Sequence, residues 1–209
     1  MVAYVFDRIL AQGVRENQIP ARSRQSRQWF RDTAASTRIS PNAVVRGAAM
    51  KESGSALLSK PIPGTSGIGR MYTFFYDPKT KKDLPYYDRF PLIFKIKDVE
   101  NGFLGLNMHY LPPILRAKLM DALYDLASDT RYDENTRIRL SYERLQAASK
   151  FKYFKPCIKM YLRNHVRSRF VLIDATEWDM ALFLPTERFA KANKSTVWRD
   201  SRKAVRGRT

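Results

Sequence analysis

The chain has 209 residues, of which 44% are hydrophobic. This fraction is sufficient for a buried core and excludes a globally disordered chain. It contains no run of eighteen apolar residues, so no transmembrane helix is expected, and its first ten residues are too short and too charged for a secretory signal. The net charge is +18, from 38 Lys and Arg against 20 Asp and Glu. A chain this basic is expected to bind a polyanion or an acidic protein surface.

The excess positive charge is concentrated toward the two ends of the sequence. Residues 1–60 carry ten basic and four acidic side chains, and residues 151–209 carry fourteen and five, whereas the segment between them is nearly balanced. This distribution predicts a folded centre with basic extensions at both termini. The predicted regions are a basic N-terminal helical arm and irregular connector over 1–69, an α+β core over 70–194, and a basic C-terminal helix or tail over 195–209.

The N-terminal region is expected to contain one helix and a long connector. The helix runs from about Ser23 to Thr37, with Trp29 as its main apolar anchor and several arginines spaced to form one basic stripe. Residues 38–69 are interrupted by prolines and glycines, which is typical of an irregular connector. Such a long connector usually wraps over a partner or stays mobile.

The centre of the chain predicts antiparallel strands, because apolar and aromatic strand formers recur there between turn signals. The turns are the charged segment 77–83 and the Asn101-Gly102 pair. The expected strands are 71–76, 91–97, 103–108 and, as a fourth, 169–174. Short strands with tight turns favour a small, bent antiparallel sheet, a partial barrel of the SH3-like type.

After Pro112 the apolar period changes from that of strands to that of helices. Proline is favourable in the first turn of a helix, so Pro112-Pro113 and Pro156 are both expected to open one. The expected helices are 112–126, 136–149, 156–166, a short segment after Thr176, and the final segment from Ser195. The predicted fold class is therefore α+β, with the small sheet packed against several helices.

The histidines and the cysteine do not form a catalytic pattern. His109 follows a predicted strand without a nucleophile motif, so we interpret it as a core histidine with a satisfied hydrogen bond. His165 lies among arginines on a predicted helix and is interpreted as a surface or polyanion-facing residue. Cys157 is interpreted as a buried small hydrophobic residue rather than a reactive thiolate.

Clustered carboxylates would be needed for a nuclease that holds Mg²⁺. Asp77, Asp83 and Asp88 are the main candidates, but they flank aromatic turns and lie beside lysines, which favours turn formation and capping. The sequence contains no phosphate-binding glycine loop of a nucleotide enzyme. We therefore predict no enzymatic activity, no catalytic residue, no metal site, no cofactor and no small-molecule substrate.

Three groups of basic residues have the spacing of a helix face, a pattern that favours contact with phosphates. One group lies on the N-terminal helix, one follows Pro156, and one lies on the last helix. The predicted phosphate-contacting residues are Arg22, Arg24, Arg27, Arg31, Lys159, Arg163, Arg167, Arg169, Arg199, Arg202, Lys203 and Arg206. No base-reading motif accompanies them, so the pattern predicts contact with the nucleic-acid backbone without sequence readout.

Five segments carry turns and aromatic or basic residues in a distinctive order: YDPKTKKDLPYYDRFPLI (76–93), GFLGLNMHYLPP (102–113), HVRSRF (165–170), LPTERF (184–189) and DSRK (200–203). Together these segments resemble the DNA end protector family of T-even-type tailed phages. The resemblance covers roughly residues 1–30 and 70–203. It concerns turns and aromatic residues rather than a catalytic signature, so it transfers no binding residues to this chain.

The resemblance implies a non-enzymatic virion protein that binds the ends of packaged linear double-stranded DNA and blocks host exonucleases. Its partners would be DNA ends, without sequence preference, and other virion proteins at head completion, with no membrane involved. Its location would be the virion, and the host cytoplasm during assembly and infection. The alternative is a structural head-neck, tail or baseplate protein whose basic arms order against neighbouring subunits. Binding to linear DNA in isolation would distinguish the two.

Overall fold

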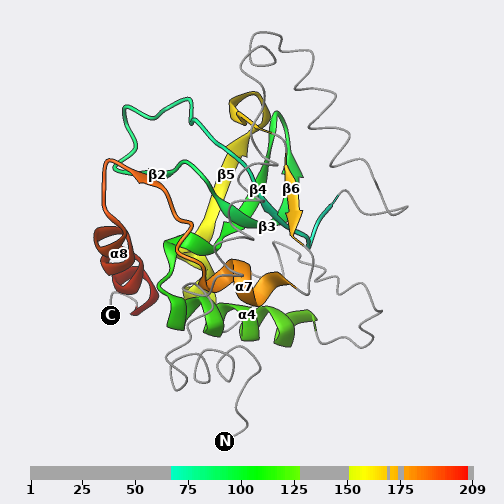
Figure 1. Cartoon of the computed structure of the whole chain (residues 1–209), viewed down its shortest axis with the longest axis vertical. Helices are drawn as coiled ribbons and strands as arrows, with labels where there is room; N and C mark the ends of the chain where they lie inside the picture. The colour runs from blue at the N-terminus through cyan, green and yellow to red at the C-terminus, as the bar shows by residue number, and fades with distance from the viewer. Residues whose placement is uncertain (1–66, 128–150, 169, 174–176, 207–209) are drawn as a thin grey trace, which may run out of the picture.

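A computed structural model describes residues 67–127, 151–168, 170–173 and 177–206 (Figure 1). The strands are β1 Met71–Thr73, β2 Tyr87–Asp88, β3 Leu92–Val99, β4 Gly102–Asn107, β5 Ile158–Leu162, β6 Val171–Ile173 and β7 Phe189–Ala190. The helices are η3 Met108–Tyr110, α4 Pro113–Ala127, α6 Phe151–Phe154, η4 Lys155–Cys157, η5 Arg163–His165, α7 Trp178–Phe183 and α8 Lys194–Arg206. The η elements are short 3₁₀ helices.

The strands form a five-stranded sheet in the order β5-β4-β3-β1-β6 and a separate two-stranded ribbon of β2 and β7. All the strand pairs are antiparallel, so the expected α+β class with a small antiparallel sheet is confirmed. β6 is the expected fourth strand. The SH3-like closure and the division into arm, core and tail stay predictions.

The β3–β4 hairpin forms at the predicted Asn-Gly turn. Asn101 takes a left-handed φ of 60°, a conformation that asparagine tolerates better than most residues. Gly102 begins β4 and pairs with Leu162 of β5. A Cβ atom on Gly102 would lie 2.3 Å from the backbone oxygen of Tyr161, so only glycine fits this close approach of β5. The two residues thus set both the turn and the next strand pairing.

The helix expected over residues 156–166 is wrong. Pro156 opens only the 3₁₀ turn η4, and the chain then extends as β5 before the short turn η5. Along β5 Tyr161 is buried, whereas its neighbour Met160 is 53% exposed, which is the alternation of a strand. Pairing of β5 with β4 overrides the helical spacing of the basic residues in this segment.

The other expected elements agree with the structure where it describes them. α4 confirms the helix at 112–126, α7 the short helix after Thr176, and α8 the final helix. β1 is shorter than the expected 71–76, and the chain beyond it reaches an isolated bridge at Tyr76. The helices expected at 23–37 and 136–149 lie outside the described residues.

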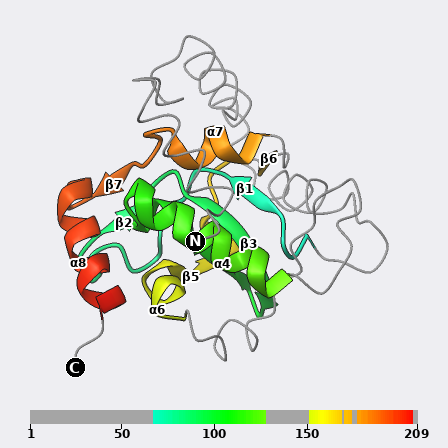
Figure 2. The same ribbon diagram turned by 90° about the horizontal axis from the view of Figure 1, so that it is seen from below.

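The sheet has an apolar layer on each face. α4 and α7 lie below it in Figure 1, and in the view from below α4 crosses in front of its strands (Figure 2). On this face Phe94 packs edge-on against Trp178 of α7, and Leu119 and Leu123 of α4 are fully buried in the same core cluster. The other face carries a second cluster of buried residues, mostly aromatic. It consists of Tyr72, Phe74, Tyr76, Ile93, Phe103, Tyr161, Val166 and Phe170.

Candidate nucleic-acid interface

The β2–β7 ribbon lies beside the main sheet, and its first strand separates inward from outward side chains. Tyr86 packs against the core cluster, and Asp88 and Phe90 are buried. Between them, Tyr87 is partly exposed and Arg89 is exposed. This alternation follows from strand geometry, in which successive side chains point to opposite faces.

The second strand of the ribbon continues the same division. Phe189 packs against the ring of Tyr110 at a centroid distance of 5.3 Å, so it faces inward. Arg188 precedes it and is exposed. The N–H of Arg89 donates to the carbonyl of Arg188 over 2.8 Å, which places these two arginines opposite each other. The ribbon therefore has a buried inner face and an outer face with two arginines.

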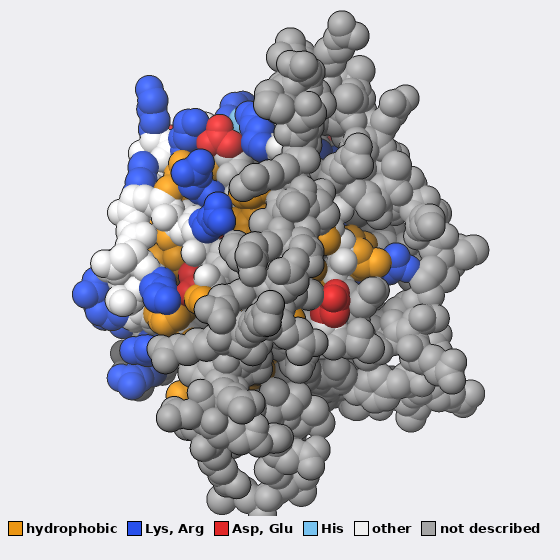
Figure 3. All heavy atoms as spheres, viewed as in Figure 1, with side chains coloured by type: hydrophobic (Ala, Val, Ile, Leu, Met, Phe, Trp, Pro, Cys, Tyr) orange, Lys and Arg blue, Asp and Glu red, His pale blue; other side chains and the backbone are white. Residues whose placement is uncertain are grey.

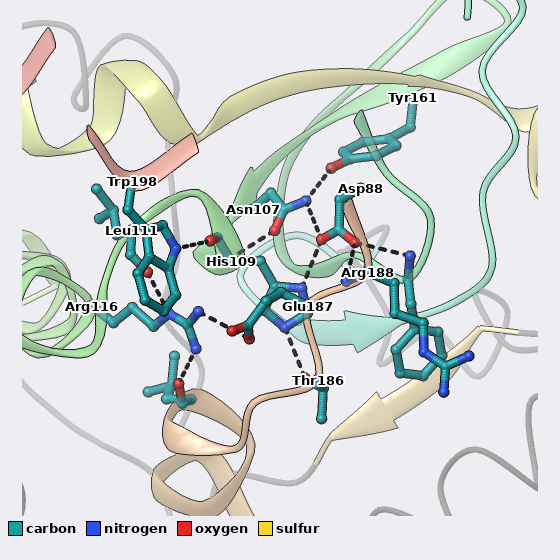
Figure 4. A network of polar contacts seen from close by, with 12 residues as sticks. Asp88, Asn107, His109, Leu111, Arg116, Tyr161, Thr186, Glu187, Arg188 and Trp198 are labelled. Atoms are coloured by element: carbon teal, nitrogen blue, oxygen red, sulfur yellow. Dashed lines mark hydrogen bonds and ion pairs between the residues drawn. The ribbon is translucent and has the colours of Figure 1, made fainter. Parts of the chain in front are cut away.

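A buried polar network holds the inner face in place (Figure 4). The imidazole Nδ1 of His109 lies 2.7 Å from Oδ2 of Asp88, and its Nε2 lies 2.8 Å from Oγ1 of Thr186. The side-chain amide of Asn107 donates to Oδ2 of Asp88 over 3.1 Å and to the hydroxyl of Tyr161 over 3.0 Å. The network thus joins the ribbon to the sheet and to residue 186, which precedes β7.

Backbone groups complete the shell around Asp88. Its Oδ1 accepts from the N–H of Phe90 over 3.0 Å and from the N–H of Arg188 over 3.3 Å. Burial opposes ionisation of this carboxyl, but the charge of His109 and the hydrogen bonds from His109, Phe90 and Asn107 outweigh it and hold the pKa of Asp88 below its ordinary value. The carboxylate is therefore the charged centre of the network.

The order Asp88–His109–Thr186 is that of a hydrolytic triad, in which a carboxylate orients a histidine toward a hydroxyl nucleophile. Burial argues against that role, because His109 is 0% exposed, Asp88 3% and Thr186 7%. We interpret the three residues as a structural network. The expectation that His109 is a core histidine with satisfied hydrogen bonds is confirmed.

A second buried group, Arg116 of α4, links the helices to the ribbon. Its guanidinium donates to the carbonyl of Leu111 and to that of Leu182, each over 2.7 Å, and contacts Glu187 at 3.3 Å. The guanidinium carbon also lies 5.7 Å from the centre of the Trp198 ring on α8. Burial raises the pKa of Glu187, but the charge of Arg116 outweighs this effect and leaves that pKa lowered.

α8 presents an inner face to the core and a basic outer face. Val197, Ser201 and Val205, spaced by four, are buried, and the indole N–H of Trp198 donates to the carbonyl of His109 over 2.9 Å. The side chain of Asn193 accepts from the N–H of Thr196, which is the arrangement of an N-cap. The exposed basic residues of the helix are Lys194, Arg199, Arg202, Lys203 and Arg206.

The charged loop before β2 lies against the segment that leads into α8. The ammonium group of Lys191 donates to the carbonyl of Lys82 over 2.7 Å and to that of Leu84 over 3.0 Å. Burial and the nearby carboxylate of Asp200 on α8 raise the pKa of Tyr86, whose side chain hydrogen-bonds to that carboxylate. These contacts bring the loop, the ribbon and α8 into one surface.

We call this surface the basic edge. It is visible in Figure 3 as Lys and Arg side chains gathered on the left side of the described part, over the loop, the ribbon and α8. Its members are Lys79, Lys81, Lys82, Arg89, Arg188, Lys191, Lys194, Arg199, Arg202, Lys203 and Arg206. Segments 77–89 and 187–206 carry these eleven basic and five acidic side chains. Two of the five, Asp88 and Glu187, belong to the buried network, so the outward charge is strongly positive.

The structure separates the basic residues that the sequence grouped after Pro156. Lys159 lies on β5 with its ammonium 4.1 Å from the centre of the Tyr110 ring, and burial lowers its pKa. Arg163 pairs with Asp98, and Arg167 is exposed. The predicted common helix face of these three residues is therefore wrong, because β5 is a strand. Arg169 lies outside the described residues.

The other predicted groups have different outcomes. Arg199, Arg202, Lys203 and Arg206 are all exposed on α8, as the helical spacing predicted. Arg22, Arg24, Arg27 and Arg31 lie outside the described residues. Sequence reasoning missed the lysines at 79–82, which it assigned only to a turn, and Lys191 and Lys194. The only feature of the sequence that could have indicated these lysines is the high density of charged residues in segments 77–89 and 187–206.

The described part of the chain contains neither a metal-binding cluster nor a membrane-spanning helix. Among the described residues, no three His, Cys, Asp or Glu side chains converge to form a group that could hold a metal ion. Within the described ranges, no helix combines the length and the apolar character that a bilayer span requires. Cys157 is fully buried, which confirms its interpretation as a small core residue.

Comparison with known proteins gives one match. Residues 4–201 match the family described as phage T4 terminal DNA protecting protein. No curated protein and no solved structure matches the chain. The match spans most of the chain and includes the ribbon and most of α8.

Proposed function

The chain belongs to the family of the phage T4 terminal DNA protecting protein, and we propose that it binds DNA ends through the phosphates along its basic edge. It is a phage protein that binds and protects the ends of DNA. The observation that carries the binding site is the gathering of exposed cations from three separate segments on one surface. Bound at an end, the chain would cover the strand termini that an exonuclease must reach.

The charge pattern of the basic edge suits a polyanion more than a small ligand. Cations that neutralise DNA phosphates release condensed counterions, which gives affinity without sequence preference. On α8, Arg199, Arg202, Lys203 and Arg206 are exposed, whereas Lys194 also pairs with Glu187 at 3.5 Å. If about six phosphates are neutralised, the logarithm of the binding constant should fall with the logarithm of salt at a slope near −5.

Further contacts are proposed from residues that flank the basic edge. Arg167 is bonded through its backbone N–H to the carbonyl of Phe75, and the N–H of Asp77 donates to the carbonyl of His165. These bonds hold the turn of Arg163 and Arg167 beside the start of the charged loop. The N-terminal arginines at 22, 24, 27 and 31, together with Arg169, remain proposed phosphate contacts. Lys159 is proposed with a smaller contribution, because its ammonium lies over an aromatic ring.

We also propose that the protection is not enzymatic and that the protein travels with packaged DNA among other virion proteins. A steric cap needs no catalytic group, and the triad-like residues support this role by holding the ribbon rather than by facing a substrate. During assembly and infection the protein would also be present in the host cytoplasm.

The test compares DNA forms that differ only in their ends. Purified protein should bind a blunt linear duplex more tightly than the same duplex closed by hairpin loops at both ends, and should slow exonuclease digestion of the open form. The triple variant Arg202→Ala, Lys203→Ala, Arg206→Ala should lose much of this protection. Lys118→Ala, which removes an exposed lysine of α4 outside the basic edge, is the matched control.

Equal affinity for open and closed duplexes, with no more protection than an unrelated basic protein gives, would reject the end-binding proposal. That outcome would favour the structural alternative, a head-neck, tail or baseplate protein with basic arms against its neighbours. Digestion of DNA by the pure protein with Mg²⁺ would reject the non-enzymatic proposal.

A further inference from the structure

A preference for DNA ends requires a contact that the interior of a duplex cannot offer. Phosphates repeat along the whole helix, so phosphate contacts fix position and orientation but do not distinguish an end from the middle. The feature that only an end exposes is the flat face of the terminal base pair. A protein surface that recognises an end should therefore contain an accessible aromatic ring among its cations, because aromatic rings stack on bases.

The outer face of the β2–β7 ribbon carries such a ring. Tyr87 is partly exposed and lies between Tyr86 and Asp88, which both face inward, so its ring is on the outer face. It is paired across the ribbon with Ala190, which has a small side chain. The ring is therefore available to a flat partner.

The neighbouring aromatic rings are engaged inside the protein. Tyr86 packs against Tyr110 and Phe189, at centroid distances of 6.0 and 6.4 Å. Phe75 packs against the buried Phe90 at 4.8 Å. The indole of Trp198 is bonded to the carbonyl of His109. Tyr87 differs from all of these rings in its outward position on the ribbon.

Cations surround Tyr87 on the same face. Arg89 follows it by two residues and therefore shares its face, and Arg188 lies opposite Arg89 across the ribbon. The guanidinium carbon of Arg188 lies 5.7 Å from the centre of the Phe90 ring, and both arginines are exposed. The ribbon that carries the ring lies between the charged loop and α8 in Figure 1.

The support under the ring is rigid. Asp88, the next residue, is fixed by His109, by Asn107 and by two backbone N–H groups. Preorganisation of this kind reduces the entropy lost when a ligand binds. A ring carried on a flexible loop would lose more of its stacking free energy to ordering.

We propose that the Tyr87 ring stacks on the exposed face of the terminal base pair, while Arg89 and Arg188 contact the phosphates beside it. This inference rests on the proposed function and adds to it the group that distinguishes an end from the interior of DNA. The occupant is thus the blunt or nearly blunt terminus of a duplex, and no particular base sequence is required.

The experiment measures the affinity ratio between the open duplex and the same duplex closed by hairpin loops. Tyr87→Ala should lower this ratio on the order of tenfold, since stacking of a base on an aromatic ring is lost, and should leave affinity for the closed duplex unchanged. Tyr87→Phe keeps the ring and should keep the ratio. Leu172→Ala, which truncates an exposed apolar residue on β6, is the control for loss of exposed apolar surface.

A second readout reports stacking directly. An open duplex with 2-aminopurine at its terminal position should change fluorescence on binding the wild-type protein and the Phe variant, and should change much less with the Ala variant. The same probe placed in the interior should not respond. Thermal unfolding of each variant shows that the folded state is retained.

The outcomes separate this inference from the function on which it rests. If the wild-type protein prefers open ends and Tyr87→Ala keeps that preference, the stacking inference is overturned and end binding stands. If the wild-type protein itself shows equal affinity for both duplexes, the proposed function fails and the inference fails with it. Loss of affinity of Tyr87→Ala for both duplexes alike would also overturn the stacking role.

Discussion

The buried polar network and the basic edge are built from the same short segments, yet their charges are treated in opposite ways. Asp88 points inward to His109 and to backbone donors, whereas Arg89, the next residue, is exposed. Glu187 is paired with Arg116, whereas Arg188, which follows it, is on the outer face. The inward carboxylates of Asp88 and Glu187 have partners, and most of the outward charges are basic.

The inward charges stabilise the fold, and the outward charges are available for binding. A buried charge must be paired, because desolvation without a partner costs several kcal/mol. An exposed charge is solvated by water, so a surface can accumulate cations at little cost to folding and reserve them for a polyanion. The ribbon joins the two kinds of charge. Arg89 follows the buried Asp88, and Arg188 follows the paired Glu187.

The largest expected effect comes from removing a carboxylate from the buried polar network. Asp88→Ala leaves His109, Asn107 and two backbone N–H groups without their acceptor. We expect a loss of about 3–5 kcal/mol in the free energy of unfolding, measured by urea denaturation. Asp83→Ala, which removes an exposed carboxylate of the charged loop, is the control. A loss as small as that of the control would contradict the anchoring role.

Acid should weaken the same network. The pKa values of Asp88 and Glu187 are lowered in the folded protein, so both carboxyls bind protons more weakly there than in the unfolded chain. Their stabilising contribution is therefore complete above their ordinary values of 3.8 and 4.5 and is lost as the pH falls through the lower folded values. Urea denaturation between pH 7 and pH 3 should show this loss, and Asp88→Asn should reduce its pH dependence.

Removing exposed cations of the basic edge should weaken DNA binding with little change in the free energy of unfolding. The triple variant Arg202→Ala, Lys203→Ala, Arg206→Ala should shallow the salt dependence of DNA binding by about one unit of slope per lost contact. Its free energy of unfolding should change by no more than about 0.5 kcal/mol per substitution. Lys118→Ala should leave the slope unchanged. An unchanged slope in the triple variant would show that α8 does not contact phosphates.

The smallest expected effect is the reactivity of the Cys157 thiol, which reports how well the core excludes solvent. Burial raises the pKa of the Cys157 thiol to about 12, so the folded protein should hardly react with iodoacetamide at pH 8. Alkylation followed by mass spectrometry measures this. In urea, or in the Asp88→Ala variant, the thiol should react through the unfolded state. Rapid labelling of the native wild-type protein would contradict the burial of this residue.

Features that depend on local periodicity and turn chemistry could be predicted from the sequence alone. The sequence predicted the central strands and α4, because period-two and helical patterns there are uninterrupted and bounded by Asn101-Gly102 and Pro112. It also predicted the exposed cations of α8, since residues spaced by three and four share one helix face. The core positions of His109 and Cys157 were predicted because no other catalytic residues accompany them in the sequence.

The remaining features depend on contacts between residues that are far apart in the sequence. Lys159 and Arg163 have helical spacing, but pairing with β4 makes their segment a strand, and a single sequence does not show that pairing. The two-residue strands β2 and β7 are too short to give a period, so the inward position of Asp88 and the outward position of Tyr87 depend on contacts about a hundred residues apart. The basic edge arises in the same way, because Lys191, which precedes α8, donates to the carbonyls of Lys82 and Leu84 more than a hundred residues away.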